Sequence, residues 1–418
     1  MRTLSSSQWV KTLRPQTTVY LPGVSGESLA IYKALQDDPE FAASVRFVGM
    51  HFPGINRSDY LGLHAQARQR AYFMLPGLRA GLASGRGELM PLDHPRIYRD
   101  LAGLEVDVAV VQVSPPDEQG FCSPGLSYDF HPAVWSGARQ RVAHVNPDLP
   151  KTRGSFRIHV SELDAMVDEA SPLVQLADGK DPADERLRRQ AAAVAELVRD
   201  GDTIEFGVGK LPSAIAAALV NHRRLRIWSG MIASSVLTLL DSGAVHGAAS
   251  VESGVALGEA ALYDRVGRDD AFYFRPVNET HDVGRLMRIE RFCAINSAIE
   301  VDLFGQANAD MIKGRYVAGV GGLPAFAAGA ALSPGGRSIV VLPAATDDGR
   351  FSRVVLNVGK QAMAALPRHA ADTVVTEYGV AELGGLSLHE RARAMIRIAA
   401  PQFRDELERA WSEMRDGL

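Results

Sequence analysis

The sequence predicts an α/β fold made of two open, mainly parallel-sheet domains. Short apolar runs, many rich in β-branched residues, alternate with helical patterns along most of the 418 residues. Residues 45–50, 106–113, 203–206, 338–342 and 373–376 are typical of strands. Because these runs are nearly continuous in apolar residues, helices are expected to cover both faces of each sheet, as in parallel sheets.

Composition excludes several classes of protein. Hydrophobic residues make up 46% and charged residues 22%, which is typical of a globular chain. The net charge of −4 offers no strong field for nucleic acid or an anionic membrane. No apolar run is long enough to span a bilayer, and the first residues lack the apolar core of a signal peptide. We therefore expect a cytoplasmic protein that binds neither nucleic acid nor membrane.

Cysteine and histidine spacing predicts no metal site. The two cysteines, Cys122 and Cys293, lie far apart and form no ligand cluster or disulfide framework. The histidines lack ligand spacing such as HxxxH. We therefore expect no metal. We also expect no permanently bound cofactor.

A domain boundary is predicted near residue 182. Residues 178–182 (DGKDP) have turn chemistry, and an apolar helix stripe follows at residues 187–198. A new strand–loop–helix unit then begins after Gly201. We expect one α/β domain over residues 1–182 and a second over residues 183–418.

Two glycine clusters are candidates for ligand loops. The first reads GVGKLP at residues 207–212, between the predicted strand 203–206 and a predicted buried helix at residues 213–220. Such a loop and helix N-terminus can offer free backbone N–H groups to an anion or a carbonyl, but it can equally be a tight turn. The second reads GVGG at residues 319–322, with the same two interpretations.

Asn296 is a polar residue inside the apolar segment AINSA. Its amide could donate a hydrogen bond to a carbonyl oxygen, as in an oxyanion hole, or it could be a satisfied amide of the core.

These segments, in this order, resemble the acetyl-CoA hydrolase/transferase family, the single-chain class I CoA-transferases that include 4-hydroxybutyrate CoA-transferases. The resemblance covers nearly the whole chain. It rests on VSPPDEQGFCS (113–123), GVGKLP (207–212), INSAIEVDLFGQ (295–306), GVGG (319–322) and VVTEYGVAEL (374–383).

The resemblance implies two α/β domains of CoA-transferase type, usually in a homodimer. It implies an active site between the domains, with CoA held largely by the second domain as a thioester substrate. It also implies that Asn296 lies near the thioester carbonyl. The residues expected at the coenzyme are Gly207, Val208, Gly209, Lys210, Leu211, Gly230, Gly321 and Gly322.

Gly230 departs from the family pattern at the most important position. The family's nucleophile is a glutamate in a block similar to residues 227–236 (IWSGMIASSV), and Gly230 occupies its place. Glycine cannot attack an acyl-CoA or carry a glutamyl-CoA thioester. Ala325 also stands where an aspartate is common, and Trp228 could narrow the pocket or belong to the core.

The first hypothesis is therefore an acyl-CoA hydrolase or related CoA-thioester enzyme without a glutamyl-CoA intermediate. The wider superfamily has members without the glutamate that hydrolyse carbon–carbon bonds in CoA-linked rings, so this class stays open. Direct attack by water needs a base. Candidate bases are Glu252, Glu259, Glu279 and His281, with Glu27 and His51 from the first domain, while Ser229 could be a polar contact.

Two alternatives remain. The chain could be a CoA-transferase that uses a displaced carboxylate and passes CoA to a carboxylic acid acceptor. It could also be a non-catalytic CoA-thioester-binding protein. The sequence does not specify the acyl group.

Overall fold

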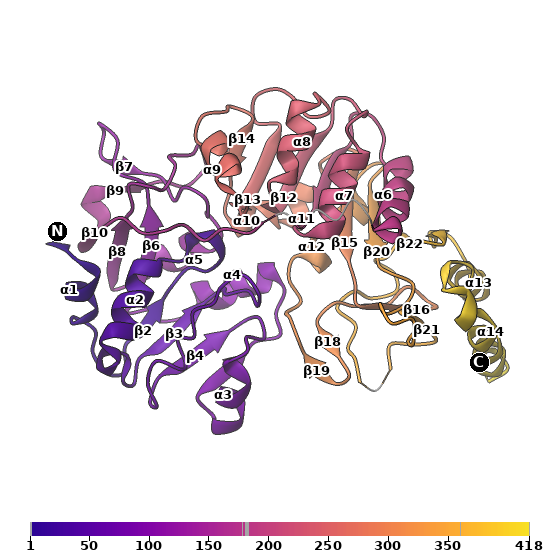
Figure 1. Cartoon of the computed structure of the whole chain (residues 1–418), viewed down its shortest axis with the longest axis horizontal. Coiled ribbons are helices and arrows are strands. Elements are labelled where there is room, and N and C mark those ends of the chain that lie inside the picture. The colour runs from indigo at the N-terminus through magenta and orange to yellow at the C-terminus, as the bar shows by residue number, and fades with distance from the viewer. Residues whose placement is uncertain (1, 178, 180–183, 360, 418) are drawn as a thin grey trace. The chain divides into compact units, whose positions relative to one another are not determined.

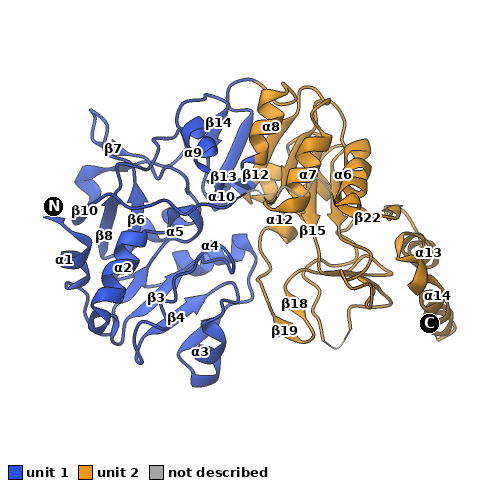
Figure 2. Cartoon of the chain, in the orientation of Figure 1, with its two compact units in different colours: residues 1–177, 230–234, 247–280 blue, residues 178–229, 235–246, 281–418 orange. Residues whose placement is uncertain are grey.

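The structure is a computed structural model that describes residues 2–177, 179, 184–359 and 361–417. The described residues form two compact units (Figures 1 and 2). Unit 1 comprises residues within 1–177, 230–234 and 247–280, and unit 2 comprises residues within 178–229, 235–246 and 281–418. The predicted boundary at residue 182 lies outside the described residues. Residues 230–234 and 247–280 group with the first unit, whereas the sequence pattern places them in the second domain, and the predicted division stays a prediction.

Unit 1 is built on an eight-stranded sheet in which neighbouring strands run parallel. In spatial order its strands are β1 (Arg2–Leu4), β10 (Ala165–Asp168), β8 (Gln140–Val145), β6 (Val108–Val113), β2 (Thr18–Tyr20), β3 (Arg46–Gly49), β4 (Arg68–Ala71) and β5 (Gly87–Leu89). All six residues of the central strand β6 are buried. This is expected where helices cover both faces of a parallel sheet.

Helices and short strands complete unit 1. The helices are α1 (Ser6–Val10), α2 (Leu29–Asp37), α3 (Leu78–Ser84), α4 (His94–Ala102), α5 (His131–Trp135), α9 (Ala260–Val266) and α10 (Val277–Thr280). The other strands are the antiparallel pair β7 (Phe121–Cys122) and β9 (Ile158–His159) and the parallel pair β13 (Val251–Ala256) and β14 (Phe272–Phe274).

Unit 2 contains the strand order β12, β11, β15, β20, β22 and β23. Their bounds are β12 (Arg226–Ile232), β11 (Thr203–Phe206), β15 (Phe292–Ser297), β20 (Arg337–Val341), β22 (Thr373–Thr376) and β23 (Gly379–Glu382). These strands pair in parallel with their neighbours, except that β22 and β23 are antiparallel. Strand β12 passes from unit 2 into unit 1 between Ser229 and Gly230.

The remaining elements of unit 2 flank this sheet or follow its strand ends. The helices are α6 (Glu185–Leu197), α7 (Lys210–Ala218), α8 (Ser235–Asp241), α11 (Val283–Leu286), α12 (Leu323–Leu332), α13 (Leu388–Ile398) and α14 (Arg404–Arg415). Short strands are β16 (Glu300–Asp302), β17 (Ala307–Asn308), β18 (Met311–Ile312), β19 (Arg315–Tyr316) and β21 (Val354–Val355).

The predicted α/β class with large, mainly parallel sheets is confirmed. The predicted strands at residues 203–206 and 373–376 have the same bounds in the structure. Two helix boundaries differ. Helix α7 begins at Lys210 rather than at residue 213, and α6 ends at Leu197, because Val198 already has an extended backbone with ψ 141°.

Among the described residues, no helix combines the length and the apolar character that a membrane crossing would need.

Candidate functional site

The first glycine loop turns the chain from strand β11 into helix α7. Gly209 has φ +113°, a backbone region that L side chains rarely adopt, so glycine is needed there. No described atom lies within 4 Å of where a side-chain carbon would stand at Gly207 or Gly209. Gly209 is the N-cap residue of α7, and it provides no side-chain cap to this helix end. Val208 and Leu211 are half-buried, and Lys210 is exposed.

The second glycine loop lies against His281. Gly321 has φ +71°, and Gly322 is the N-cap residue of α12. A side-chain carbon at Gly322 would lie 2.5 Å from Nε2 of His281, so glycine permits a close approach of this ring. His281 is 2% exposed and packs on Phe326 of α12, with 4.4 Å between the ring centroids. The structure therefore brings two predicted residues, Gly322 and His281, together.

Asn296 has a buried carboxyl group as its partner. It lies on β15, next to β11, and its Nδ2 donates a hydrogen bond to Oε2 of Glu205 at 2.6 Å. Glu205 is 3% exposed. Burial raises the pKa of the Glu205 carboxyl to about 8, although hydrogen bonds from Asn296 and the Ile295 backbone oppose the shift. Near neutral pH this carboxyl is therefore mostly protonated.

The register of the sheet relates Asn296 to the first glycine loop. Phe206 of β11 pairs with Ile295 of β15 in parallel. Gly207 follows Phe206, and Asn296 follows Ile295, so both residues lie at the same carboxyl end of these two strands. Ligands of open α/β sheets bind at this end.

Glu252 and Glu279 lie in unit 1 and share one partner, Arg275. Arg275 donates from Nε to Glu252 and from Nη1 to Glu279, the latter at 2.8 Å. Ser155 Oγ also donates to Glu279, at 2.6 Å. The predicted role of Glu252 and Glu279 as catalytic bases stays a prediction.

The segment around Gly230 is tightly packed. Ser229 is 1% exposed and donates from Oγ to the carbonyl of Phe206 at 3.0 Å. Trp228 is partly buried against the cluster that contains Phe292 and Phe326. Within unit 1, a side-chain carbon at Gly254 would lie 2.9 Å from the Gly230 carbonyl oxygen, so the two backbones approach closely.

Glu27 and His51, two further candidate bases, meet in the interior of unit 1. Each is 1% exposed, and His51 Nε2 lies 3.9 Å from Glu27 Oε1. Glu27 also accepts hydrogen bonds from Asn56 Nδ2 at 2.8 Å and from the Tyr60 hydroxyl at 3.2 Å. Burial lowers the pKa of His51, although the nearby Glu27 opposes this. The remaining candidate base, Glu259, is exposed and precedes α9 without a side-chain hydrogen bond to the helix end.

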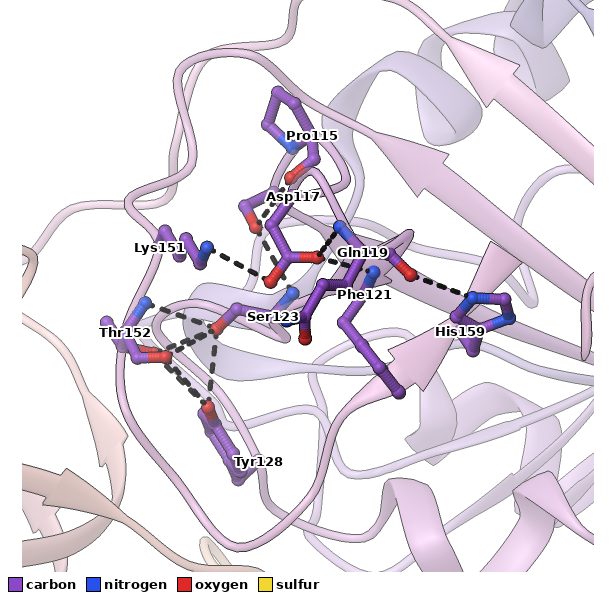
Figure 3. A network of polar contacts seen from close by, with 10 residues as sticks. Pro115, Asp117, Gln119, Phe121, Ser123, Tyr128, Lys151, Thr152 and His159 are labelled. Carbon is purple, nitrogen blue, oxygen red and sulfur yellow. Dashed lines mark hydrogen bonds and ion pairs between the residues drawn. The ribbon is translucent and has the colours of Figure 1, made fainter. Parts of the chain in front are cut away.

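The block at residues 113–123 forms a polar network in unit 1 (Figure 3). Asp117 accepts hydrogen bonds from the backbone N–H of Phe121 at 2.9 Å and from Lys151 Nζ at 3.2 Å. Ser123 Oγ contacts Thr152 at both its hydroxyl and its carbonyl, each at 3.1 Å. The network joins the turn after β6 to residues 151 and 152 of the same unit.

The part of the chain that the structure describes contains no group of three or more His, Cys, Asp or Glu side chains suited to hold a metal.

Two family models match most of the chain. Residues 5–178 match the acetyl-CoA hydrolase/transferase N-terminal domain, and residues 258–411 match the acetyl-CoA hydrolase/transferase C-terminal domain.

The chain is similar to proteins of known sequence and structure along nearly its whole length. The chain is 31% identical to the 4-hydroxybutyrate coenzyme A transferase of Clostridium kluyveri, over 97% of this chain and 96% of that protein. In structure it resembles RipA from Yersinia pestis, with a TM-score of 0.91 and 26% identity over 99% of this chain and 98% of RipA. It also resembles a 4-hydroxybutyrate CoA-transferase from Porphyromonas gingivalis, with a TM-score of 0.79 and 29% identity over 100% and 98% of the two chains.

Proposed function

Because this chain belongs to the acetyl-CoA hydrolase/transferase family, we propose that it binds an acyl-CoA thioester and releases CoA without a glutamyl-CoA intermediate. The proposal rests on one observation: Gly207 and Asn296 lie at the same carboxyl end of the parallel strands β11 and β15. This arrangement brings an open glycine loop and a side-chain amide to one edge of unit 2. The predicted position of the full site between the two domains stays a prediction.

In this proposal the loop residues hold the coenzyme. The backbone N–H groups at the start of α7 and the glycines of the second loop contact the CoA part of the substrate. The coenzyme-binding residues are Gly207, Val208, Gly209, Lys210, Leu211, Gly230, Gly321 and Gly322. The substrate is the thioester itself, and the family chemistry calls for no permanently bound cofactor.

Asn296 is proposed to donate a hydrogen bond to the thioester carbonyl as negative charge develops on its oxygen. Gly230 leaves no carboxylate for covalent attack, so water attacks the carbonyl carbon and the C–S bond breaks. His281, Glu252 and Glu279 are the candidate bases. The position of His281 beside Gly322 supports it, whereas the other two share Arg275.

A second candidate function is CoA transfer to a carboxylic acid through a displaced carboxylate. The relative from Clostridium kluyveri, named a 4-hydroxybutyrate coenzyme A transferase, favours it. A homodimer and a cytoplasmic location remain predictions with either function, as does the third possibility of a CoA-thioester-binding protein without turnover.

The test is to incubate the protein with acetyl-CoA, butyryl-CoA or 4-hydroxybutyryl-CoA, with and without acetate or succinate. We expect CoA release that needs no acceptor and no mass adduct on the intact protein. Release only with an acceptor, together with an adduct, would establish the transferase instead. Tight binding without turnover would establish the binding protein.

Gly230→Glu is the companion variant, with Gly230→Gln as its size-matched control. We expect the glutamate variant alone to gain a CoA adduct and some acceptor-dependent transfer, because only a carboxylate can form the thioester. Equal behaviour of the two variants would contradict the assignment of position 230.

A further inference from the structure

The buried carboxyl of Glu205 has no role in the proposed chemistry so far. It is 3% exposed, it precedes the first glycine loop by two residues, and no cation among the described residues pairs with it. Burying a charged carboxyl without a cation costs free energy, so such a group is usually neutral. Its presence also raises the question of its function.

The hydrogen bond from Asn296 to Glu205 indicates what that function is. Glu205 pairs with Ala294 in the parallel register, and side chains two residues apart on a strand point to the same face. Asn296 and Glu205 therefore lie on one face of the sheet, where Nδ2 and Oε2 are 2.6 Å apart. This bond uses one N–H of the carboxamide, fixes its plane and leaves the second N–H for another acceptor.

We propose that Glu205 is a positioning residue, which through its hydrogen bond to Asn296 aims the carboxamide at the carbonyl oxygen of the acyl-CoA thioester. The inference rests on the proposed function, because it gives Asn296 a substrate to face. Glu205 itself contacts no substrate in this scheme.

The protonation state of Glu205 matters to the same step. A neutral carboxyl accepts the bond from Asn296 and adds no charge. A carboxylate there would set a negative charge next to the oxygen on which negative charge develops, and that opposes the reaction. Burial keeps the pKa of the Glu205 carboxyl at about 8, so the neutral form prevails at pH 7.

Few other ionisable groups surround Glu205. The neighbouring elements carry Arg226 on β12, Cys293 on β15, Arg285 on α11 and His281 before α11, while α12 carries none. Burial raises the pKa of the Cys293 thiol to about 12, so it stays protonated through the range that matters here. A pH-dependent change at Asn296 is therefore assigned to its source by substituting Glu205.

The kinetic test compares Glu205→Gln, Glu205→Leu and Asn296→Ala with the unchanged enzyme, using acetyl-CoA as the probe. We expect Leu at position 205 to lower kcat by about tenfold or more while KM changes by less than about threefold, because a misdirected donor acts on the transition state. Gln accepts the same hydrogen bond and should restore kcat. In the Asn296→Ala background, Glu205→Leu should have no further effect on kcat, since the two residues act as a unit.

A second measurement needs no turnover. In protein labelled with ¹⁵N at asparagine, the Asn296 side-chain signal is assigned by its loss in Asn296→Ala. We expect this signal to titrate with a midpoint near pH 8 and to become independent of pH in Glu205→Gln. A midpoint that persists in Glu205→Gln would assign the titration to another group and overturn the proposal, even if a leucine variant failed to fold.

The failures are distinguishable. If the unchanged protein neither binds nor hydrolyses any of the acyl-CoA probes, the proposed function is wrong. If Asn296→Ala abolishes activity but Glu205→Leu keeps full kcat, only the positioning role of Glu205 is wrong.

Discussion

Glu205 carries a negative charge in the unfolded chain at neutral pH and is mostly neutral in the folded protein. The ordinary pKa of a glutamate carboxyl is 4.5, and burial raises the pKa of Glu205 to about 8 in the fold. Folding therefore binds a proton between these values, and the contribution of Glu205 to stability falls as pH rises from 4.5 to 8.

We predict that Glu205→Gln is stabilised relative to the unchanged protein as pH rises. A tenfold difference in proton affinity between the folded and unfolded chain corresponds to about 1.4 kcal/mol, so the difference in the free energy of unfolding should grow to as much as about 5 kcal/mol above pH 8. Urea unfolding of both proteins from pH 5 to 9 measures it. Asp129→Asn is the matched comparison, because burial raises the pKa of Asp129 to about 7. The stability difference between Asp129→Asn and the unchanged protein should therefore stop growing near pH 7, one unit lower than for Glu205→Gln. A difference that does not change with pH would contradict the assignment.

Single residues show which parts of the site a sequence can predict. The glycine loops stand out because φ +113° at Gly209 and the close approach at Gly322 require glycine. Glu205 was missed, since one acidic residue inside the strand TIEF gives no sign of burial or of a partner 91 residues away. The shared partner of Glu252 and Glu279, Arg275, was also missed, because the sequence does not show which charged side chains meet, even four residues apart.

At the scale of elements, the turn that follows β6 depends on one buried hydroxyl. Ser123 is 3% exposed, and its Oγ accepts from the backbone N–H of Gly125 at 3.1 Å. It also accepts from the backbone N–H of Thr152 at 3.2 Å (Figure 3). Both donors are buried, so they lose their acceptor when the hydroxyl is removed.

Ser123→Ala should lower the free energy of unfolding by about 1–3 kcal/mol, because two buried N–H groups are left without a partner. Ser136→Ala is the control, since this serine of unit 1 is exposed and should change stability by less than about 0.5 kcal/mol. Thermal and urea unfolding measure both. A Ser123→Ala protein as stable as the control would show that the hydroxyl is dispensable.

Elements were predicted better at their centres than at their ends. The apolar runs of β11 and β22 gave correct bounds because burial on both faces requires them. Helix α7 begins earlier than expected because the chain already turns at Gly209, which leaves Pro212 inside the first turn where its missing N–H costs nothing. Such ends depend on local backbone angles that hydrophobic periodicity does not report.

At the scale of the whole molecule, unit 1 is assembled from three separate stretches of sequence. Strand β13 and its neighbours bind the first stretch through backbone hydrogen bonds, from Tyr128 N to Gly254 O at 2.9 Å and from Ala256 N to Leu126 O at 2.8 Å. Phe274 N donates to Arg153 O at 2.8 Å, and its ring stacks on Tyr128. Sequence patterns cannot report such distant pairings, so a division at residue 182 was the natural prediction.

A fragment of residues 1–182 should therefore unfold without cooperativity, whereas a fragment of residues 1–280 should unfold cooperatively. The shorter fragment lacks β13, β14, α9 and α10 and leaves the carbonyls and N–H groups of residues 126–128 and 153 without their partners. Urea unfolding followed by near-ultraviolet circular dichroism compares the two. Equal cooperativity and equal midpoints would mean that the later stretches add little to unit 1.

This interrupted order of assembly has a consequence during synthesis. Thr280 leaves the ribosome about 100 residues after Ala177, a delay of roughly 5–20 s at ordinary rates of translation. Throughout that delay the face of Tyr128 that later stacks on Phe274 has nothing to cover it. During synthesis, chaperones can therefore bind the exposed surface around Tyr128 until β13 and β14 have been made and cover it.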